Sequence, residues 1–163
     1  MRFNLIKSAV LCIVAANPAA ATERHDSPLL VDTITLWLSV NFALPSPTHA
    51  PALVGLSSDE LVAMRYGPGN AARAADVVAV YDDGTIFLAK SWTGRTPAEL
   101  SILVHEMVHH LQSSAGMRFA CPGEREILAY KAQDAWLGLF GENLESAFGI
   151  DAAMIMVGTA CTH

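Results

Sequence analysis

The segment from Thr96 to Gly116 constrains the fold more than any other part of the sequence, because both of its ends carry helix signals. Thr96 is a typical N-cap, Pro97 suits the first helical position, and Glu99 stands three residues after the cap, which is the spacing of a capping box. A glycine such as Gly116 commonly ends a helix. The sequence therefore predicts a helix that runs to about Ser114.

This helix carries two histidines and a glutamate, at His105, His109 and Glu106. At about 100° per residue the histidines lie one turn apart on one face, so both imidazoles can reach one ion. Zinc accepts neutral imidazole nitrogens, and a catalytic zinc keeps one position open for water. Glu106 points in a neighbouring direction and can take a proton from that water. A solvated polar face is the alternative, but burying these groups without a partner would be costly.

The third ligand is expected on a later helix, predicted over 124–140 with a glycine stop after it. Glu124 and Glu126 lie about 200° apart on it, so only one of them can face the metal. Glu126 is favoured, because its face is polar and carries a small side chain that lets the two helices approach closely. The other residues of that face are Ala129, Tyr130 and Gln133. Tyr130 could then stabilise a tetrahedral oxyanion.

Alternatives to these assignments stay open. A glutamate in the first turn of a helix is also favoured by the helix dipole alone. Other residues that could supply the third ligand are Glu124, Asp134, His110 and His163. Packing between helices would also explain Tyr130. His110 lies on a different face from His109, which favours a solvated position or a hydrogen bond to a ligand.

Two runs rich in β-formers, Val77–Tyr81 and Thr85–Leu88, flank Asp82-Asp83-Gly84. Glycine tolerates the positive φ of a tight turn, so the pattern predicts a β-hairpin. Apolar spacing predicts a helix over 31–44, and Ser57 is a cap for a short helix through about residue 65. The sequence therefore predicts an α+β fold, mostly helical, in which a small antiparallel sheet packs on the histidine-bearing helix.

The N-terminus has the pattern of an export signal. Two basic residues precede an apolar stretch over 8–16, and an Ala-x-Ala site ends at Ala21. We expect residues 1–21 to be removed and 22–163 to form one secreted or periplasmic domain without a membrane span. This domain keeps Cys121 and Cys161, and a pair in an exported protein is more often bridged than left as two unrelated buried thiols.

The charge balance bears on possible partners. Ten Lys and Arg against 16 Asp and Glu give a net charge of −6, and no basic run is present. Nucleic-acid phosphates require clustered cations, so we expect no nucleic-acid partner.

The motif His105-Glu106-x-x-His109 followed by Glu126-x-x-Ala129 resembles the zincin metallopeptidases, in particular the gluzincin branch. The segment His-Glu-x-x-His-His-Leu-Gln is also similar to small exported bacterial proteins of unknown function. The resemblance covers about residues 77–140. It implies a minimal zincin-like domain in which His105, His109 and Glu126 bind Zn²⁺ and Glu106 is the general base. The metzincin branch is excluded, because Gln112 and Ala115 replace its glycine and third histidine.

The resemblance also implies an edge strand that holds an extended peptide antiparallel to itself. This edge would correspond to one strand of the Val77–Leu88 hairpin, and Thr85–Ala89 is favoured over the other strand because it leads into the histidine-bearing helix. The implied activity is hydrolysis of peptide bonds in a peptide or protein substrate. The alternative is a non-catalytic zinc-binding exported protein that acts as a partner or inhibitor module. Such a protein would keep the three ligands but would not need Glu106.

Overall fold

The computed structural model describes residues 23–24, 28–69 and 77–161. The described helices are α1 (Pro28–Phe42), α2 (Ser58–Tyr66), α3 (Pro97–Ser114), α4 (Pro122–Gly138), α5 (Leu144–Phe148) and α6 (Ala152–Thr159). The strands are β1 (Glu23–Arg24), β2 (Ala52–Leu56), β3 (Ala79–Asp82) and β4 (Thr85–Ala89). The expected α+β, mostly helical fold is confirmed. The predicted export signal and His163 lie outside the described residues.

The four strands form one mixed sheet in the order β1-β2-β4-β3. The predicted hairpin is confirmed as β3 and β4, and both residues of its turn have positive φ, 36° at Asp83 and 81° at Gly84. This is the backbone of a two-residue hairpin turn. The expectation of a purely antiparallel sheet was wrong, because β2 pairs in parallel with β4. β2 was not predicted, since Gly55 interrupts a short apolar run.

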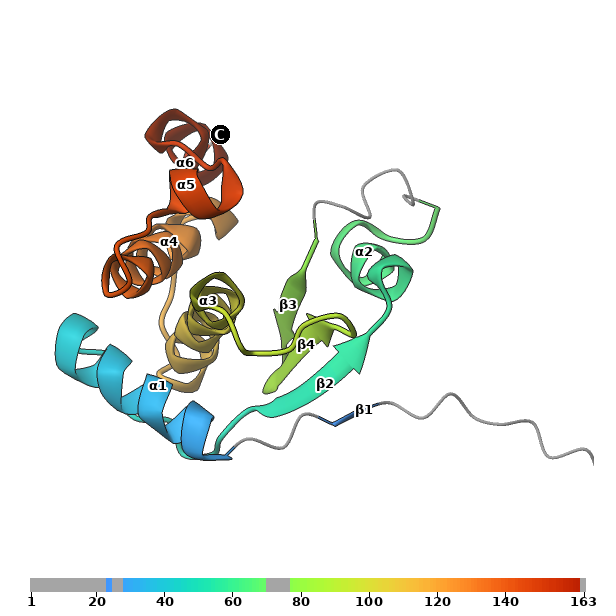
Figure 1. Ribbon diagram of the computed structural model, residues 1–163, viewed down its shortest axis with the longest axis horizontal. Coiled ribbons are helices and arrows are strands. Elements are labelled where there is room, and N and C mark those ends of the chain that lie inside the picture. Colours follow the sequence, from blue (N-terminus) through green and yellow to red (C-terminus); the bar gives the residue numbers. More distant parts are fainter. Residues whose placement is uncertain (1–22, 25–27, 70–76, 162–163) are drawn as a thin grey trace, which may run out of the picture.

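The assignment of the sheet edge to Thr85–Ala89 was also wrong. β4 lies between β2 and β3, so both of its edges are paired. The edge strands are β1 and β3, and the outer side of β3 has no strand partner among the described residues. The pairing of β2 with β4 is the physical reason, because it places β4 inside the sheet and leaves β3 at the side nearest α3 (Figure 1).

Helix α3 lies at the centre of the fold, with the sheet on one side and α1 and α4 on the other (Figure 1). Its capping box forms as predicted, because the Thr96 hydroxyl accepts from the Glu99 backbone N–H at 3.1 Å. The buried core residues that it contributes are Leu103, Val104, Met107, Val108 and Leu111. Burying such a set supplies the main stabilising term of the fold. Ala129 of α4 is fully buried against this core, as expected for closely approaching helices.

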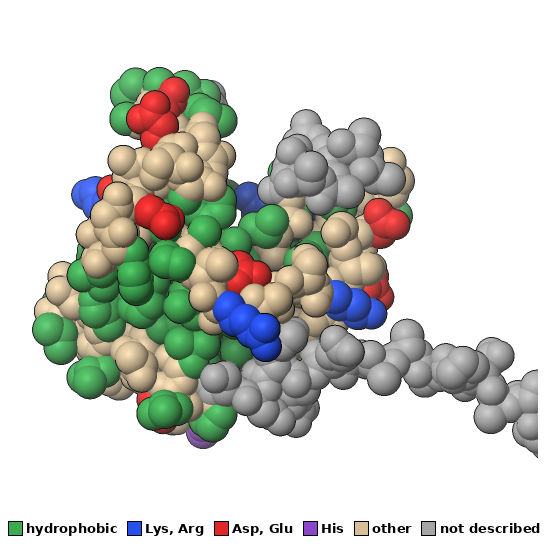
Figure 2. Space-filling model, in the orientation of Figure 1, with side chains coloured by type: hydrophobic (Ala, Val, Ile, Leu, Met, Phe, Trp, Pro, Cys, Tyr) green, Lys and Arg blue, Asp and Glu red, His purple; other side chains and the backbone are tan. Residues whose placement is uncertain are grey.

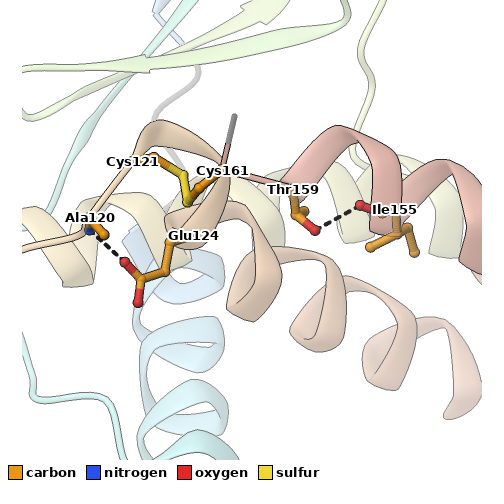
Figure 3. Close-up of a disulfide and its surroundings, with 6 residues drawn as sticks. All are labelled: Ala120, Cys121, Glu124, Ile155, Thr159 and Cys161. Carbon is orange, nitrogen blue, oxygen red and sulfur yellow. Dashed lines mark hydrogen bonds between the residues drawn. A yellow bond between two sulfur atoms is a disulfide. The ribbon is translucent and has the colours of Figure 1, made fainter. Parts of the chain in front are cut away.

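A disulfide joins Cys121 and Cys161 over a sequence separation of 40, which confirms the predicted bridge. Figure 3 shows that it ties the start of α4 to the chain just after α6. The two helices meet closely there, because a Cβ placed on Gly123 would lie 2.6 Å from the Thr159 carbonyl oxygen. The bridge is compatible with the predicted export. No helix in the described part of the chain is long and apolar enough to cross a bilayer.

Candidate metal centre

His105 and His109 of α3 and Glu126 of α4 converge on one point, as the sequence predicts. The Nε2 atoms of the two histidines each lie 3.1 Å from Oε2 of Glu126 and 3.2 Å from each other. The i, i+4 spacing brings the imidazoles together, and the close packing of α4 on α3 adds the carboxylate. These three residues could hold a metal ion.

The triangle of atoms has the dimensions of three ligands around a small cation. A point about 2.0–2.1 Å from all three atoms lies about 1 Å outside their plane, with angles of about 100° between the ligands. This is close to tetrahedral and leaves a fourth direction open. When both imidazoles are neutral and carry their hydrogens on Nδ1, the three atoms that face each other are all acceptors. A cation at that point would satisfy all three at once.

The hydrogen bonds of His105 hold it in the tautomer that metal binding needs. The Ser101 hydroxyl donates its only hydrogen to the Ala98 carbonyl at 2.7 Å, so it accepts from Nε2 of Gln133 at 3.3 Å. The amide oxygen of Gln133 therefore faces Nδ1 of His105, at 3.0 Å. Because this oxygen can only accept, Nδ1 carries the hydrogen and Nε2 keeps its lone pair for a metal.

His109 has an equivalent partner in Gln112. Nε2 of Gln112 donates to the Arg125 carbonyl at 3.1 Å, which turns the amide oxygen of Gln112 toward Nδ1 of His109, at 3.2 Å. A hydrogen on Nδ1 again leaves Nε2 free to bind a metal. Each histidine of the triad therefore faces the amide oxygen of its own glutamine, and Nδ1 of His109 is also approached by Nε of Arg125, at 3.3 Å.

The electrostatics of the site favour a charged carboxylate. Burial by itself would raise the pKa of Glu126, but hydrogen bonds and charge from His105 and His109 outweigh it and hold the pKa below the ordinary 4.5. Burial likewise lowers the pKa of His105, yet the Glu126 hydrogen bond and the charges of Glu106 and Glu126 raise it above 6.5 overall. Burial, with the charge of Glu126, raises the pKa of Tyr130. The first two shifts favour a charged carboxylate with a positive imidazole beside it, and the third keeps the Tyr130 phenol neutral.

Glu106 is 8% exposed and lines a cavity of about 320 Å³ together with the three converging residues. Figure 2 shows the surface hollowed beside the end formed by α5 and α6. Residues of β3 also line this cavity. Within the described residues, the Glu106 carboxylate forms no hydrogen bond or ion pair with another side chain. It is therefore placed as the sequence predicts, beside the histidines but outside the ligand triangle.

Tyr130 lines the same cavity and packs edge-on against the His105 ring, at 5.0 Å between centroids and 73° between planes. The packing interpretation of this residue is therefore confirmed, and its role in stabilising an oxyanion stays a prediction. Its ring supports a member of the triad, and its position on the cavity wall gives the phenol access to anything bound there.

The alternative third ligands are placed elsewhere. The Glu124 carboxylate accepts from the Ala120 backbone N–H at the start of α4 (Figure 3), and Asp134 accepts from the Leu144 N–H at 2.9 Å. Nε2 of His110 donates to the His49 carbonyl at 2.9 Å. His110 is 5% exposed, so the expectation of a solvated position was wrong. It faces away from the triad, because one residue along a helix turns the side chain by about 100°.

Sequence reasoning missed several residues of the site. Gln112 stands three residues after His109, a spacing that places both side chains on one helix face, so it could have been found. Arg65 at the end of α2 and Arg125 of α4 also line the cavity. The sequence contains no signal for Arg65, because tertiary packing alone brings α2 to this wall.

Comparison with curated proteins found no match, and comparison with solved structures found none either. One family model matches, over residues 23–163, which include all of the residues that form the candidate centre. The chain therefore belongs to the family described as DUF6647, a domain of unknown function.

Proposed function

We propose that this protein is a zinc-dependent metallopeptidase with a zincin-like fold, in which Glu106 is the general base. The observation that carries the proposal is the convergence of His105, His109 and Glu126 on one point, with Glu106 on the wall of the same cavity. A purely structural protein would need neither the two oriented imidazoles nor a further buried carboxylate beside them.

The donor set favours zinc. Two imidazole nitrogens and one carboxylate oxygen suit this ion, whereas calcium and magnesium prefer oxygen ligands. Three protein ligands instead of four are typical of a catalytic site. When bound, the ion would polarise a scissile carbonyl and lower the pKa of the water that it holds to about 7.

The proton transfers are proposed to run through Glu106. Its carboxylate faces the cavity without a side-chain partner among the described residues, so it can accept a proton from water and deliver it to the leaving amine. Tyr130 stands on the same wall, and burial keeps its phenol protonated. A protonated phenol can donate to the oxyanion that forms on the substrate carbonyl.

The edge of β3 supplies a place for an extended substrate. Val78 accepts from the Ala89 N–H, so Val78, Val80 and Asp82 turn their backbone groups toward β4. By antiparallel alternation, Ala79 and Tyr81 turn theirs outward. Both residues line the cavity. A peptide that pairs with this edge would lie beside the triad, and added-strand binding of this kind needs no particular side chains.

The test is metal analysis combined with a broad peptide-cleavage screen of wild type and Glu106→Gln. We expect about one zinc per chain in both proteins, because Glu106 is not a ligand. We expect the variant to lose about 10²–10⁴-fold in kcat/KM, the usual contribution of a general base. Glu142→Gln is the matched control, because Glu142 does not line the cavity.

Unchanged cleavage by zinc-loaded Glu106→Gln would contradict the general-base role. Zinc binding without cleavage by wild type on any peptide would instead favour the non-catalytic zinc-binding protein. A chain that binds no zinc would contradict both.

A further inference from the structure

Two arginines from different elements line the cavity of the metal centre. Arg65 belongs to the last turn of α2, and Arg125 lies beside Glu126 in the first turns of α4. Neither forms an ion pair within the described residues, where the only ion pairs join Glu126 to His105 and His109. Two cations in one cavity that form no ion pair in the described part of the chain are unexpected in a protein with a net charge of −6.

The hydrogen bonds around His109 show that Arg125 needs another partner once the metal binds. Nε of Arg125 lies 3.3 Å from Nδ1 of His109, and the amide oxygen of Gln112 lies 3.2 Å from the same nitrogen. A neutral imidazole has one donor and one acceptor nitrogen. If Nε2 binds a metal, Nδ1 carries the hydrogen and donates to Gln112. The Arg125 guanidinium then faces a donor and loses its acceptor.

The charge balance of the cavity points to an anion as that acceptor. The charged side chains lining it are two arginines and two glutamates, Glu106 and Glu126, which cancel. A divalent cation would leave an excess of two positive charges in a hollow that is partly closed to solvent. Guanidinium groups bind carboxylates with charge-assisted and often bidentate hydrogen bonds, which are the stronger kind in proteins.

We propose that the site selects peptides that carry a carboxylate next to the scissile bond, and that Arg65 and Arg125 bind this carboxylate. The inference rests on the proposed peptidase function and assigns its substrate class. The carboxylate has two sources, the C-terminus of the substrate or the side chain of an aspartate or glutamate near the cleaved bond. Both present the same two oxygens to a guanidinium, so matched peptides must separate them.

The experiment compares the zinc-loaded protein on pairs of short peptides that differ only in charge. One pair has a free C-terminus or a C-terminal amide, and the other has Asp or Asn beside the scissile bond. We expect kcat/KM to be about 10- to 100-fold higher for the charged member of at least one pair, the range that charged hydrogen bonds supply. The pair that shows the preference identifies the source.

Variants test the two arginines directly. Arg65→Gln and Arg125→Gln should each reduce the charged-to-neutral ratio at least about tenfold, whereas Arg118→Gln, which does not line the cavity, should keep it. The zinc content of each variant is also measured, because Arg125 contacts His109. If Arg125→Gln loses zinc, the result for Arg65→Gln alone decides the outcome. Ratios near one in wild type, or unchanged in Arg65→Gln, would overturn the inference.

A binding measurement separates this inference from the proposed function. The dissociation constants of the same peptide pairs are measured by calorimetry on zinc-loaded Glu106→Gln, which does not depend on turnover. Cleavage of all peptides without a charge preference would overturn the inference and leave the peptidase intact. If no peptide is cleaved, the proposed function fails, and the ratio of the dissociation constants decides whether the arginines bind a carboxylate.

Discussion

Replacing Gln133 by leucine should weaken zinc binding more than it weakens the fold. The amide oxygen of Gln133 is the acceptor for Nδ1 of His105, at 3.0 Å. The side chain of His105 is 13% exposed and Gln133 is 6% exposed, so water cannot readily take the place of the lost acceptor. An unsatisfied buried donor costs about 1–3 kcal/mol.

This cost falls mainly on the metal-bound state. Without metal, the hydrogen of His105 can move from Nδ1 to Nε2 and be donated to Glu126, at 3.1 Å. The metal-free variant then has no unsatisfied donor at Nδ1. With metal on Nε2, the hydrogen must stay on Nδ1. We therefore expect Gln133→Leu to raise the zinc dissociation constant by about 10- to 100-fold, which corresponds to about 1.4–2.7 kcal/mol.

The assay is competition between the protein and a chromophoric zinc chelator at constant pH. Gln133→Glu is the matched control, because it keeps an acceptor for Nδ1 and should bind zinc at least as tightly as wild type. Urea unfolding of both variants without metal measures any separate cost to the fold. A Gln133→Leu protein that binds zinc as tightly as wild type, or a Gln133→Glu protein that is weakened equally, would refute the reasoning.

Two further predictions concern the fold. Replacing Cys121 and Cys161 by serine should lower the free energy of unfolding by about 4 kcal/mol, because the bridge closes a long loop; an unchanged urea midpoint would contradict this. Burial raises the pKa of the Glu99 carboxylate, but hydrogen bonds from the backbone N–H groups of Thr93, Arg95 and Thr96 and from the Thr93 hydroxyl together outweigh it and lower the pKa to about 2. The stabilising effect of the Glu99 carboxylate should be complete above the unfolded pKa of about 4.3 and should disappear as the pH falls through about 2. The urea midpoints of metal-free wild type and Glu99→Gln should therefore differ at pH 6 and converge at pH 2. A difference between the midpoints that stays constant with pH would refute the assignment.

Local signals explain what the sequence could predict of the fold. The capping box of Thr96 and Glu99 sets the start of α3, and the Asp83-Gly84 turn sets the hairpin, because each depends on residues a few positions apart. Capping residues Asn143 and Asp151 also precede α5 and α6, but those helices are short and were not predicted. β2 pairs with a strand about 30 residues further along the chain, so no local pattern reveals that it displaces β4 from the edge.

The candidate site likewise has a part that the sequence could predict and a part that it could not. The i, i+4 spacing places His105 and His109 on one helix face, and the polar face of α4 identified Glu126. The contribution of Arg65 depends on how α2 packs beside the sheet, which no spacing in the sequence encodes. The tautomers of the histidines depend on Gln112 and Gln133, whose orientation is set by the Arg125 carbonyl and the Ser101 hydroxyl.

The tyrosines and the tryptophans of this protein lie in different places. All three tyrosines, Tyr66, Tyr81 and Tyr130, line the cavity, whereas none of the three tryptophans does. Trp37 and Trp136 instead pack edge-to-face between α1 and α4, with ring centroids 5.2 Å apart. Tryptophan fluorescence should therefore follow unfolding, and near-ultraviolet tyrosine absorbance should follow occupancy of the cavity, so that one unlabelled sample has two separate optical signals.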